Sequence, residues 1–339
     1  MHDRASHLAP RISRWHHRYA TLVAACTILL IAAGGMVTST GSGLSVPDWP
    51  TTYGWNMFTF PVSKWVGGIR YEHSHRLIAS TVGFLTIILA VWTWRVEPRA
   101  WVRKLGFAAL GAVVLQGLLG GITVLLFLPP AVSIGHAGLA QIFFCLTITM
   151  ALVTSPVWKN AVQPVDDPML RRVAALTTAL VYTQIIVGAT MRHNAAGLAI
   201  PDFPLAFGHV IPPVWNAKVA VNFAHRVGAL LVTLSILATS SHVLYHHPQR
   251  RELVRPALLL LALVFAQITL GAFVVWSGKN PLINTAHVVN GGAVLATSLV
   301  LTLRSFRARF ERSVQPIVQA QPRPSSPASS PLPPHGVRP

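Results

Sequence analysis

Eight long apolar runs dominate this chain of 339 residues and leave few folds open to it. A helix needs about 20 apolar residues to cross the hydrocarbon core of a bilayer, and each run is about that long. Inside lipid every backbone polar group needs a partner within the protein, so each run is expected to be helical. The runs cover residues 19–38, 74–94, 105–127, 133–153, 171–191, 218–244, 257–276 and 283–303. The sequence therefore predicts an all-α integral membrane protein with eight transmembrane helices.

Composition excludes the soluble alternatives. Only 11% of the residues are charged, against about 25% in an ordinary soluble domain. So few charges cannot cover a water-exposed surface, and the clustering of apolar residues argues against a fibrous or disordered chain. The first run is longer than the core of a signal peptide, so we expect a retained anchor. Cys26 and Cys145 lie apart in apolar runs, which predicts neither a disulfide framework nor a zinc site.

The basic residues predict the orientation of the chain. Of the 27 Lys and Arg residues, 20 lie in the two tails and in the loops near 95–104, 154–172 and 245–256. The loops on the opposite side hold four, namely Lys64, Arg70, Arg192 and Lys279. Because Lys and Arg are enriched in cytoplasmic loops, both termini are predicted to be cytoplasmic. The net charge of +18 thus reflects membrane topology, and nucleic acid is not expected as a partner.

The chain contains an internal repeat. GGMVTSTGSGLSVPDWP begins at Gly34, and GATMRHNAAGLAIPDFP begins at Gly188, an offset of 154. Three further features return in the same order: His75-Arg76 as His225-Arg226, Gln116-x-x-x-Gly120 as Gln267-x-x-x-Gly271, and His136 as His287. We therefore expect two tandem four-helix bundles. Each half has an even number of spans, so a pseudo-twofold axis should run along the membrane normal.

This division predicts four segments. They are a cytoplasmic N-terminal tail at 1–18, an N-terminal half at 19–158, a C-terminal half at 159–305 and a disordered cytoplasmic tail at 306–339. The last segment is rich in Pro, Ser and Gln, a composition that does not build a packed core.

Four of the 15 histidines lie in apolar runs at matched positions: His75, His136, His225 and His287. Each is near the outer end of its helix, so all four have a similar depth. A single intramembrane histidine can be a packing residue, but two duplicated pairs favour ligands. Two imidazoles that face each other without a third ligand suit haem iron, because the porphyrin supplies four more nitrogens.

Glu72 distinguishes the first half from the second. It precedes His75 by three residues and shares its helix face, whereas the second half has Asn222 at the matching place. A charge inside a membrane costs about 2.5–3.5 kcal/mol at mid-span. We interpret Glu72 as an acid beside the haem pocket of the first half, with an ion pair to Arg76 or a place among headgroups as the alternatives. His73 is expected to point elsewhere, toward water or a propionate.

Three further pairs of repeated residues are candidates for a propionate or pocket role. An arginine after each ligand fits a propionate, although snorkelling to the interface explains it nearly as well. An aspartate between prolines is interpreted as turn-forming first, and the aromatic residue after it as a pocket cap or an interfacial anchor. The pairs are Arg76 and Arg226, Asp48 and Asp202, and Trp49 and Phe203. The Gln-x-x-x-Gly elements at 116–120, 184–188 and 267–271 are interpreted as helix-packing positions.

Together, the loops GLSVPDWP and GLAIPDFP with YEHSHR, GHAGLAQ, NFAHR and NTAHVVNGG resemble haem A synthase over about residues 20–303. The resemblance implies that the enzyme oxidises the C8 methyl group of haem O to a formyl group by two successive hydroxylations, which gives haem A. It implies a haem b cofactor on His225 and His287, haem O on His75 and His136, and an essential Glu72. The product would serve haem-copper terminal oxidases, and the expected location is a bacterial plasma membrane.

One departure and two rival interpretations accompany this resemblance. Some members carry a cysteine pair in the first outer loop, but 39–70 and 191–217 contain no Cys, so no thiol step is assigned. A two-haem cytochrome b that only transfers electrons fits the four histidines equally well, and Glu72 argues against it. A transporter built from parallel repeats needs no histidine pairs. The electron donor, homo-oligomerisation and direct contact with a haem O synthase stay open.

Overall fold

The computed structural model describes residues 4–159 and 165–307, which fold into helices joined by loops. The long helices are α1 (Arg4–Ser39), α2 (Ile69–Val96), α3 (Ala100–Leu125), α4 (Pro130–Thr154), α6 (Pro168–His193), α7 (Ala217–His246), α8 (Arg251–Trp276) and α9 (Pro281–Ser305). The short elements are α5 (Pro156–Lys159) and two single-turn 3-10 helices, η1 (Met57–Thr59) and η2 (Val62–Lys64).

Within the described ranges, eight helices are long and apolar enough to cross a membrane, as the sequence predicts. The all-α membrane fold class is therefore confirmed. The tail predicted at 306–339 lies almost wholly outside the described residues.

Two boundaries differ from the prediction. α1 begins at Arg4, well before residue 19, because helical hydrogen bonds continue past the point where the apolar run ends. α3 ends at Leu125 although Leu126, Phe127 and Leu128 are apolar. There the backbone takes positive φ angles of 56° and 60° at Phe127 and Leu128, and Pro129 follows. Hydropathy detects where a chain is apolar, and backbone hydrogen bonding decides where the helix stops.

Polar side chains cap the N-termini of several helices, and several begin with proline. The carboxylate of Asp167 accepts a hydrogen bond from the Leu170 N–H at the start of α6, and the amide of Asn216 does the same for Val219 in α7. Proline occupies the first helical position of α4, α6 and α9, where its missing N–H costs nothing.

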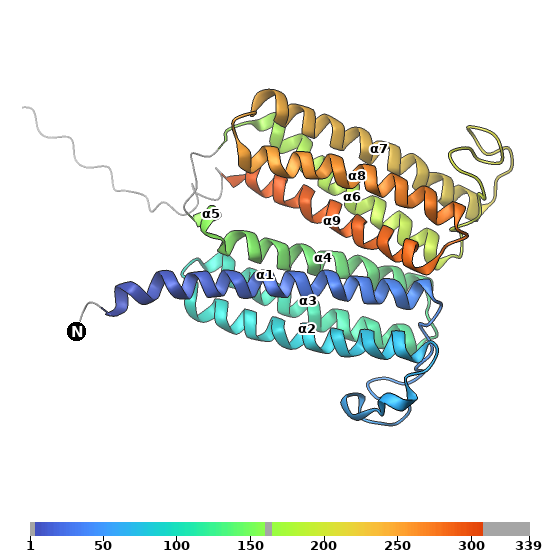
Figure 1. The fold of residues 1–339 in the computed structure, drawn as a ribbon, viewed down its shortest axis with the longest axis horizontal. Helices are drawn as coiled ribbons and strands as arrows, with labels where there is room; N and C mark the ends of the chain where they lie inside the picture. Colours follow the sequence, from blue (N-terminus) through green and yellow to red (C-terminus); the bar gives the residue numbers. More distant parts are fainter. Residues whose placement is uncertain (1–3, 160–164, 308–339) are drawn as a thin grey trace, which may run out of the picture.

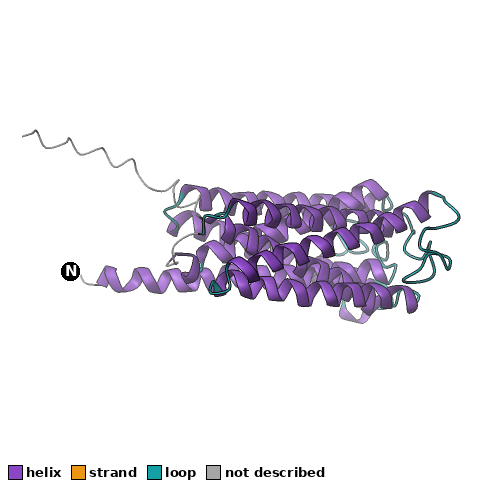
Figure 2. Ribbon diagram, turned by 90° about the horizontal axis from the view of Figure 1, so that it is seen from above, coloured by secondary structure: helices purple, strands orange, loops and turns teal. Residues whose placement is uncertain are grey.

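The long helices form two four-helix groups that lie side by side (Figure 1). The group α1–α4 is joined through α5 to the group α6–α9. The long loops 40–68 and 194–216 both lie at one end of the molecule, here named the loop end (Figures 1 and 2). α1 begins and α9 finishes at the opposite end, here named the tail end. The two halves predicted from the repeat are consistent with these two helix groups.

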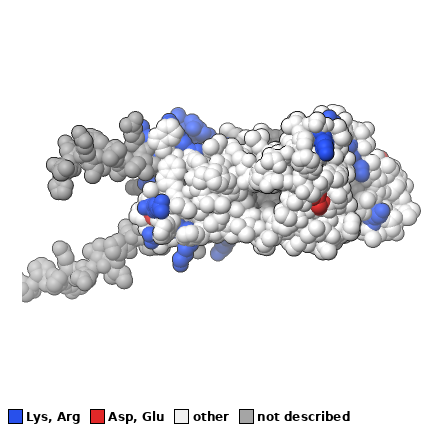
Figure 3. Space-filling view, turned by 90° about the horizontal axis from the view of Figure 1, so that it is seen from below, with Lys and Arg blue, Asp and Glu red and all other residues white. Residues whose placement is uncertain are grey.

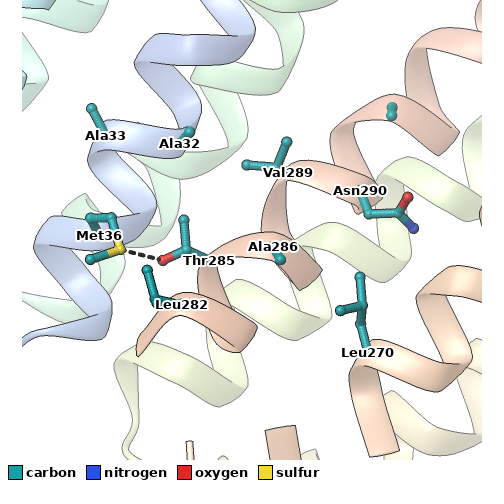
Figure 4. A pocket seen from close by; sticks show the side chains of 10 residues that line it. Ala32, Ala33, Met36, Leu270, Leu282, Thr285, Ala286, Val289 and Asn290 are labelled. Atoms are coloured by element: carbon teal, nitrogen blue, oxygen red, sulfur yellow. Dashed lines mark hydrogen bonds between the residues drawn. The ribbon is translucent and has the colours of Figure 1, made fainter. Parts of the chain in front are cut away.

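α1 and α4 of the first group pack against α6 and α9 of the second. Arg192, near the end of α6, donates hydrogen bonds to the Gly35 carbonyl at 2.9 Å and to the Ser39 hydroxyl at 3.1 Å. Figure 4 shows a groove on this seam, where the Thr285 hydroxyl of α9 donates to Met36 Sδ of α1 at 3.2 Å. Polar contacts near the loop end therefore join the halves.

Charged residues gather toward the two ends of the molecule. Figure 3 shows Lys and Arg at the tail end and at the loop end, with an uncharged stretch between them on that face. This distribution fits an apolar belt in contact with lipid.

Candidate functional site

The four predicted ligands all lie near the loop end of their helices. His75 is in α2, His136 in α4, His225 in α7 and His287 in α9, each within the first three turns. One matched pair therefore belongs to each helix group, and all four side chains are partly buried.

The pair in the second half has the spacing that one metal atom needs. The ring centres of His225 and His287 are 6.5 Å apart. An imidazole nitrogen binds a metal at about 2 Å and lies about 1 Å from its own ring centre, so two imidazoles on one metal have ring centres about 6 Å apart. A single iron atom between these two rings is therefore compatible with the structure.

Each histidine ring rests on a glycine of a neighbouring helix. A methyl group added at that glycine would lie about 3 Å from Cε1 of the imidazole, closer than such atoms normally approach. The contacts pair Gly34 with His75 (3.0 Å), Gly120 with His136 (3.1 Å), Gly188 with His225 (2.9 Å) and Gly271 with His287 (3.2 Å). All four rings are thus positioned in the same way, by a glycine of a neighbouring helix, with two such contacts in each half of the repeat.

Buried ring nitrogens also point to a missing partner. Within the described residues, Nδ1 of His75, His136 and His287 is buried without a hydrogen bond. Buried polar atoms without partners are rare in folded proteins, so each such atom needs an explanation. A haem bound between each pair of rings, with its iron held by the imidazoles, fits these residues.

The Gln-x-x-x-Gly elements contact the histidines as well as packing helices. Nε2 of Gln116 lies 3.3 Å from Nε2 of His136, and Nε2 of Gln267 lies 3.2 Å from Nε2 of His287. Nε2 of Gln184 lies 3.1 Å from Nδ1 of His225. The spacing of four brings both residues of each element to the same ring. The sequence signal was present, but the packing interpretation missed this second contact.

Glu72 is buried and forms an ion pair with Arg76, which is one of the alternatives predicted from the sequence. Its Oε1 accepts a hydrogen bond from Arg76 at 2.6 Å, and its Oε2 accepts one from the Val46 N–H at 2.8 Å. Only 4% of the Glu72 side chain is exposed. At the matching place, Asn222 accepts a hydrogen bond from Arg226 at 3.1 Å and donates to the carbonyls of Ala196 and Gly197. The two halves therefore differ in charge at this position.

Arg76 ties the loop after α1 to α2. Besides Glu72, it donates to the backbone carbonyls of Val46 at 2.8 Å, Asp48 at 2.6 Å and Thr51 at 3.1 Å. These contacts direct the guanidinium into its own loop. A bond to a haem propionate stays a prediction.

Arg226 repeats this arrangement at an offset of 154 in the loop. It donates to the carbonyls of Ile200 at 3.2 Å, Asp202 at 2.8 Å and Leu205 at 2.7 Å. The arginine after each predicted ligand thus anchors the loop that covers its half.

Asp48 forms a turn. Its oxygens accept hydrogen bonds from the N–H groups of Tyr53 at 2.7 Å and Gly54 at 2.9 Å and from the Thr51 hydroxyl. Burial opposes ionisation, but the hydrogen bonds from Gly54, Thr51 and Tyr53 outweigh it and lower the pKa of Asp48. Tyr53 and Gly54 both have positive φ, 50° and 75°, a conformation that these bonds help to hold.

Asp202 forms the same turn in the second loop. It accepts from the N–H groups of Phe207 at 2.7 Å and Gly208 at 2.8 Å. Hydrogen bonds from Gly208 and Phe207 lower the pKa of Asp202. The turn-forming interpretation of both aspartates therefore agrees with their geometry.

The two repeated aromatic residues differ in their contacts. The indole of Trp49 lies on Gly121 of α3, where an added methyl group would come within 2.5 Å of it. Phe203 instead contacts Trp276 of α8, with ring centres 6.2 Å apart, and lies under the Arg226 guanidinium. Each residue therefore packs its loop against a helix, Trp49 against α3 and Phe203 against α8.

His73 lies below the first loop. It is fully buried, its Nδ1 is 3.1 Å from the Thr52 hydroxyl, and its ring contacts Phe60 and Trp65. Its Nε2 has no hydrogen-bond partner within residues 4–159 and 165–307. These contacts tie the loop to α2. His73 therefore points away from the ligand position, but into the loop and not toward water as expected.

A polar cluster at the tail end was missed. Oδ2 of Asp167 lies 2.8 Å from Nε2 of both His242 and His247. One ligand atom from each residue lies within 4.8 Å of the others, a spacing that one divalent cation could bridge. No local motif reveals this cluster, because 75 residues separate Asp167 from His242.

Comparisons with known proteins agree with this geometry. A profile of the family COX15-CtaA, cytochrome oxidase assembly protein, matches residues 17–300. A haem A synthase of Geobacillus kaustophilus is 30% identical over an alignment of 308 residues that covers 86% of this chain and 92% of that protein. A haem A synthase of Symbiobacterium thermophilum is 31% identical over an alignment of 293 residues that covers 82% of this chain and 92% of that protein. The chain therefore belongs to the cytochrome oxidase assembly family COX15-CtaA.

Proposed function

We propose that this chain is a haem A synthase, an oxidoreductase that converts the C8 methyl group of haem O into the formyl group of haem A by two successive hydroxylations. The family and the names of the relatives support this function. The observation that carries the proposal is the difference between two otherwise matched halves. Both have a pair of glycine-seated histidines, and one of them adds the buried acid Glu72. A cytochrome that only transfers electrons needs no such difference.

In this proposal the C-terminal half holds haem b between His225 and His287, and the N-terminal half binds haem O between His75 and His136. The 6.5 Å between the ring centres of His225 and His287 supports the first assignment. The presence of Glu72 in the other half supports the second. When bound, haem supplies the electron transfer and oxygen chemistry that the oxidation of a methyl group requires.

Glu72 would handle protons or position water beside the carbon that is oxidised. Arg76 and the Val46 N–H hold its two oxygens in one orientation, and one helical turn separates it from His75. A carboxylate in a fixed place can accept or pass a proton during each hydroxylation. Arg76 offsets the cost of keeping this charge out of water.

We further propose that the tail end faces the cytoplasm of a bacterial plasma membrane and the loop end faces outward. The 20-to-4 distribution of Lys and Arg supports this orientation, because the excess marks the cytoplasmic side. Both haem sites then lie near the outer side of the bilayer, and the product serves terminal oxidases in the same membrane.

Haem analysis tests the proposal. The chain is expressed in cells that make haem O, purified, and its extracted haems are separated by chromatography. Haem b together with haem O or haem A supports the synthase. Haem b alone identifies an electron-transfer cytochrome instead, and colourless protein contradicts both. His225→Ala and His287→Ala should lose haem b, whereas His75→Ala and His136→Ala should keep it and lack haem O and haem A.

A further inference from the structure

Among the described residues, three arginines at the loop end are largely buried, and two of them serve their own loops. Arg76 and Arg226 direct both terminal nitrogens to acceptors, most of which are carbonyls of the loop that covers their half. The third is Arg192, in the last turn of α6. The sequence pointed to the arginine after each ligand as a propionate candidate, and it gave no such signal for Arg192.

Arg192 has donors that the rest of the described chain does not use. Its Nη2 donates to the Gly35 carbonyl at 2.9 Å and to the Ser39 hydroxyl at 3.1 Å. Within residues 4–159 and 165–307, its Nε and Nη1 make no hydrogen bond, and neither atom is enclosed. No carboxylate of those residues forms an ion pair with it. A charge drawn out of water without a counter-ion is costly, so an anion bound at this place would be favourable.

The guanidinium of Arg192 lies against the first half, although its backbone belongs to the second. It is held on α1 by Gly35 and Ser39. The residue before Gly35 is Gly34, on which the ring of His75 rests. The charge of a C-terminal helix is thus placed beside the helix that positions a ligand of the N-terminal pair.

His193, the next residue of α6, adjoins the other ligand of that pair. It lies close enough to His136 to act on it electrostatically. At the offset of 154, Thr38 and Ser39 of α1 match Arg192 and His193. The Thr38 hydroxyl donates to a carbonyl of its own helix at 2.8 Å. The first half therefore has no cation of its own at this position and receives one from the second half.

A carboxylate is the anion that best suits this guanidinium. The N–H groups of an arginine form a planar fork that matches the two oxygens of a carboxylate, and such charge-assisted hydrogen bonds are stronger than neutral ones. The carboxylates of a haem are its propionates. Haem b and haem O share this chemistry, and the position of the guanidinium on α1 favours the haem of the N-terminal half.

We propose that Arg192 binds a propionate of haem O, so that the C-terminal half completes the substrate site of the N-terminal half. This inference rests on the proposed function, in which haem O lies between His75 and His136. The two halves then cooperate in binding the substrate, and the seam between them is part of the substrate site.

Titration with haem O and with its dimethyl ester tests the proposal, because the ester keeps the porphyrin and removes the propionate charges. The full chain is purified from cells that make haem b and no haem O, and binding is followed by the Soret absorbance. Arg192→Gln should bind haem O about tenfold more weakly than the unaltered protein does, as expected for the loss of a hydrogen bond to a charged group. It should bind the ester as the unaltered protein does. Arg192→Lys keeps the charge and should recover part of the affinity for haem O.

Lys218→Gln is the matched control, because Lys218 is an exposed cation at the same end of the molecule. It should bind both porphyrins as the unaltered protein does. A merely structural effect of Arg192→Gln would weaken both porphyrins equally, and that result, or an unchanged affinity for haem O, overturns the inference. Loss of haem b from Arg192→Gln with unchanged binding of haem O assigns the guanidinium to the other haem and overturns it as well. If the unaltered protein bound neither haem b nor haem O, the proposed function would fail instead, so the two failures are distinct.

Discussion

Glu72 and Arg76 form a buried ion pair at 2.6 Å, one turn apart on α2. Their counterparts Asn222 and Arg226 form a neutral hydrogen bond at 3.1 Å. The two arginines otherwise make matching contacts with their loops. The negative charge of Glu72, in place of the neutral Asn222, is therefore the difference between the halves at this position. This relationship makes the role of Glu72 directly testable.

Replacing Glu72 by Gln should abolish haem A formation without changing haem binding. The amide keeps the size of the side chain and can still accept from Arg76, but it cannot take up a proton at neutral pH. The measurement is chromatography of extracted haems together with the absorption spectrum of the purified protein. The matched control is Asn222→Asp, which adds an acid to the other half and should not increase haem A. A Glu72→Gln protein that still makes haem A removes Glu72 from the mechanism.

Removing Arg76 should destabilise the protein more than removing Arg226. Arg76→Ala leaves Glu72 as a buried charge without its partner, a change that costs about 3–5 kcal/mol in comparable pairs. Arg226→Ala loses hydrogen bonds to a neutral amide and to carbonyls, each worth about 0.5–3 kcal/mol. Thermal unfolding in detergent measures both variants. The double variant Glu72→Gln with Arg76→Ala should recover part of the loss, and equal effects of the two single variants would contradict the argument.

Gly188→Ala should lower the haem b content. The new methyl group would lie 2.9 Å from Cε1 of His225, so the ring must move, and overpacking of this kind costs about 1–3 kcal/mol. Gly117→Ala in α3 is the control, because an added methyl group there meets nothing within 4 Å. The haem-to-protein ratio, measured as the pyridine complex, compares the two. Equal haem-to-protein ratios in the two variants would show that Gly188 does not position His225.

Much of the fold could be predicted because it depends on local sequence. Each span is a continuous apolar run, and the repeat aligns His75 with His225 without any knowledge of packing. The predicted end of the third span at residue 127 was wrong because Leu126 and Phe127 are apolar yet lie beyond the last helical turn, which ends at Leu125. Periodicity and hydropathy report the environment of a residue, and the end of a helix depends on backbone geometry.

The candidate site was predicted only in outline for a different reason. The histidines could be found because they repeat, but the contact of Arg76 with Val46, 30 residues away, has no local signature. Gln184 was visible as a motif, yet its contact with His225 depends on how α6 and α7 cross. Long-range contacts between polar side chains need the packed structure before they can be identified.

The cluster at the tail end predicts a pH dependence of stability. Burial alone would raise the pKa of Asp167, but hydrogen bonds from His242, the Leu170 N–H and His247 outweigh it and hold the pKa well below its ordinary value. A lowered folded-state pKa means that the carboxylate stabilises the fold above the unfolded value, about 3.9 for Asp, and that this contribution is lost as the pH falls toward the folded-state value. Asp167→Asn should therefore melt at a lower temperature than the unaltered protein at pH 7, and the gap should narrow as the pH falls from about 5 to about 3. The control is Asp166→Asn, whose carboxylate is largely exposed beside Arg171 and should contribute little, about 0–1 kcal/mol. A gap for Asp167→Asn that stays constant across this range would contradict the electrostatic explanation.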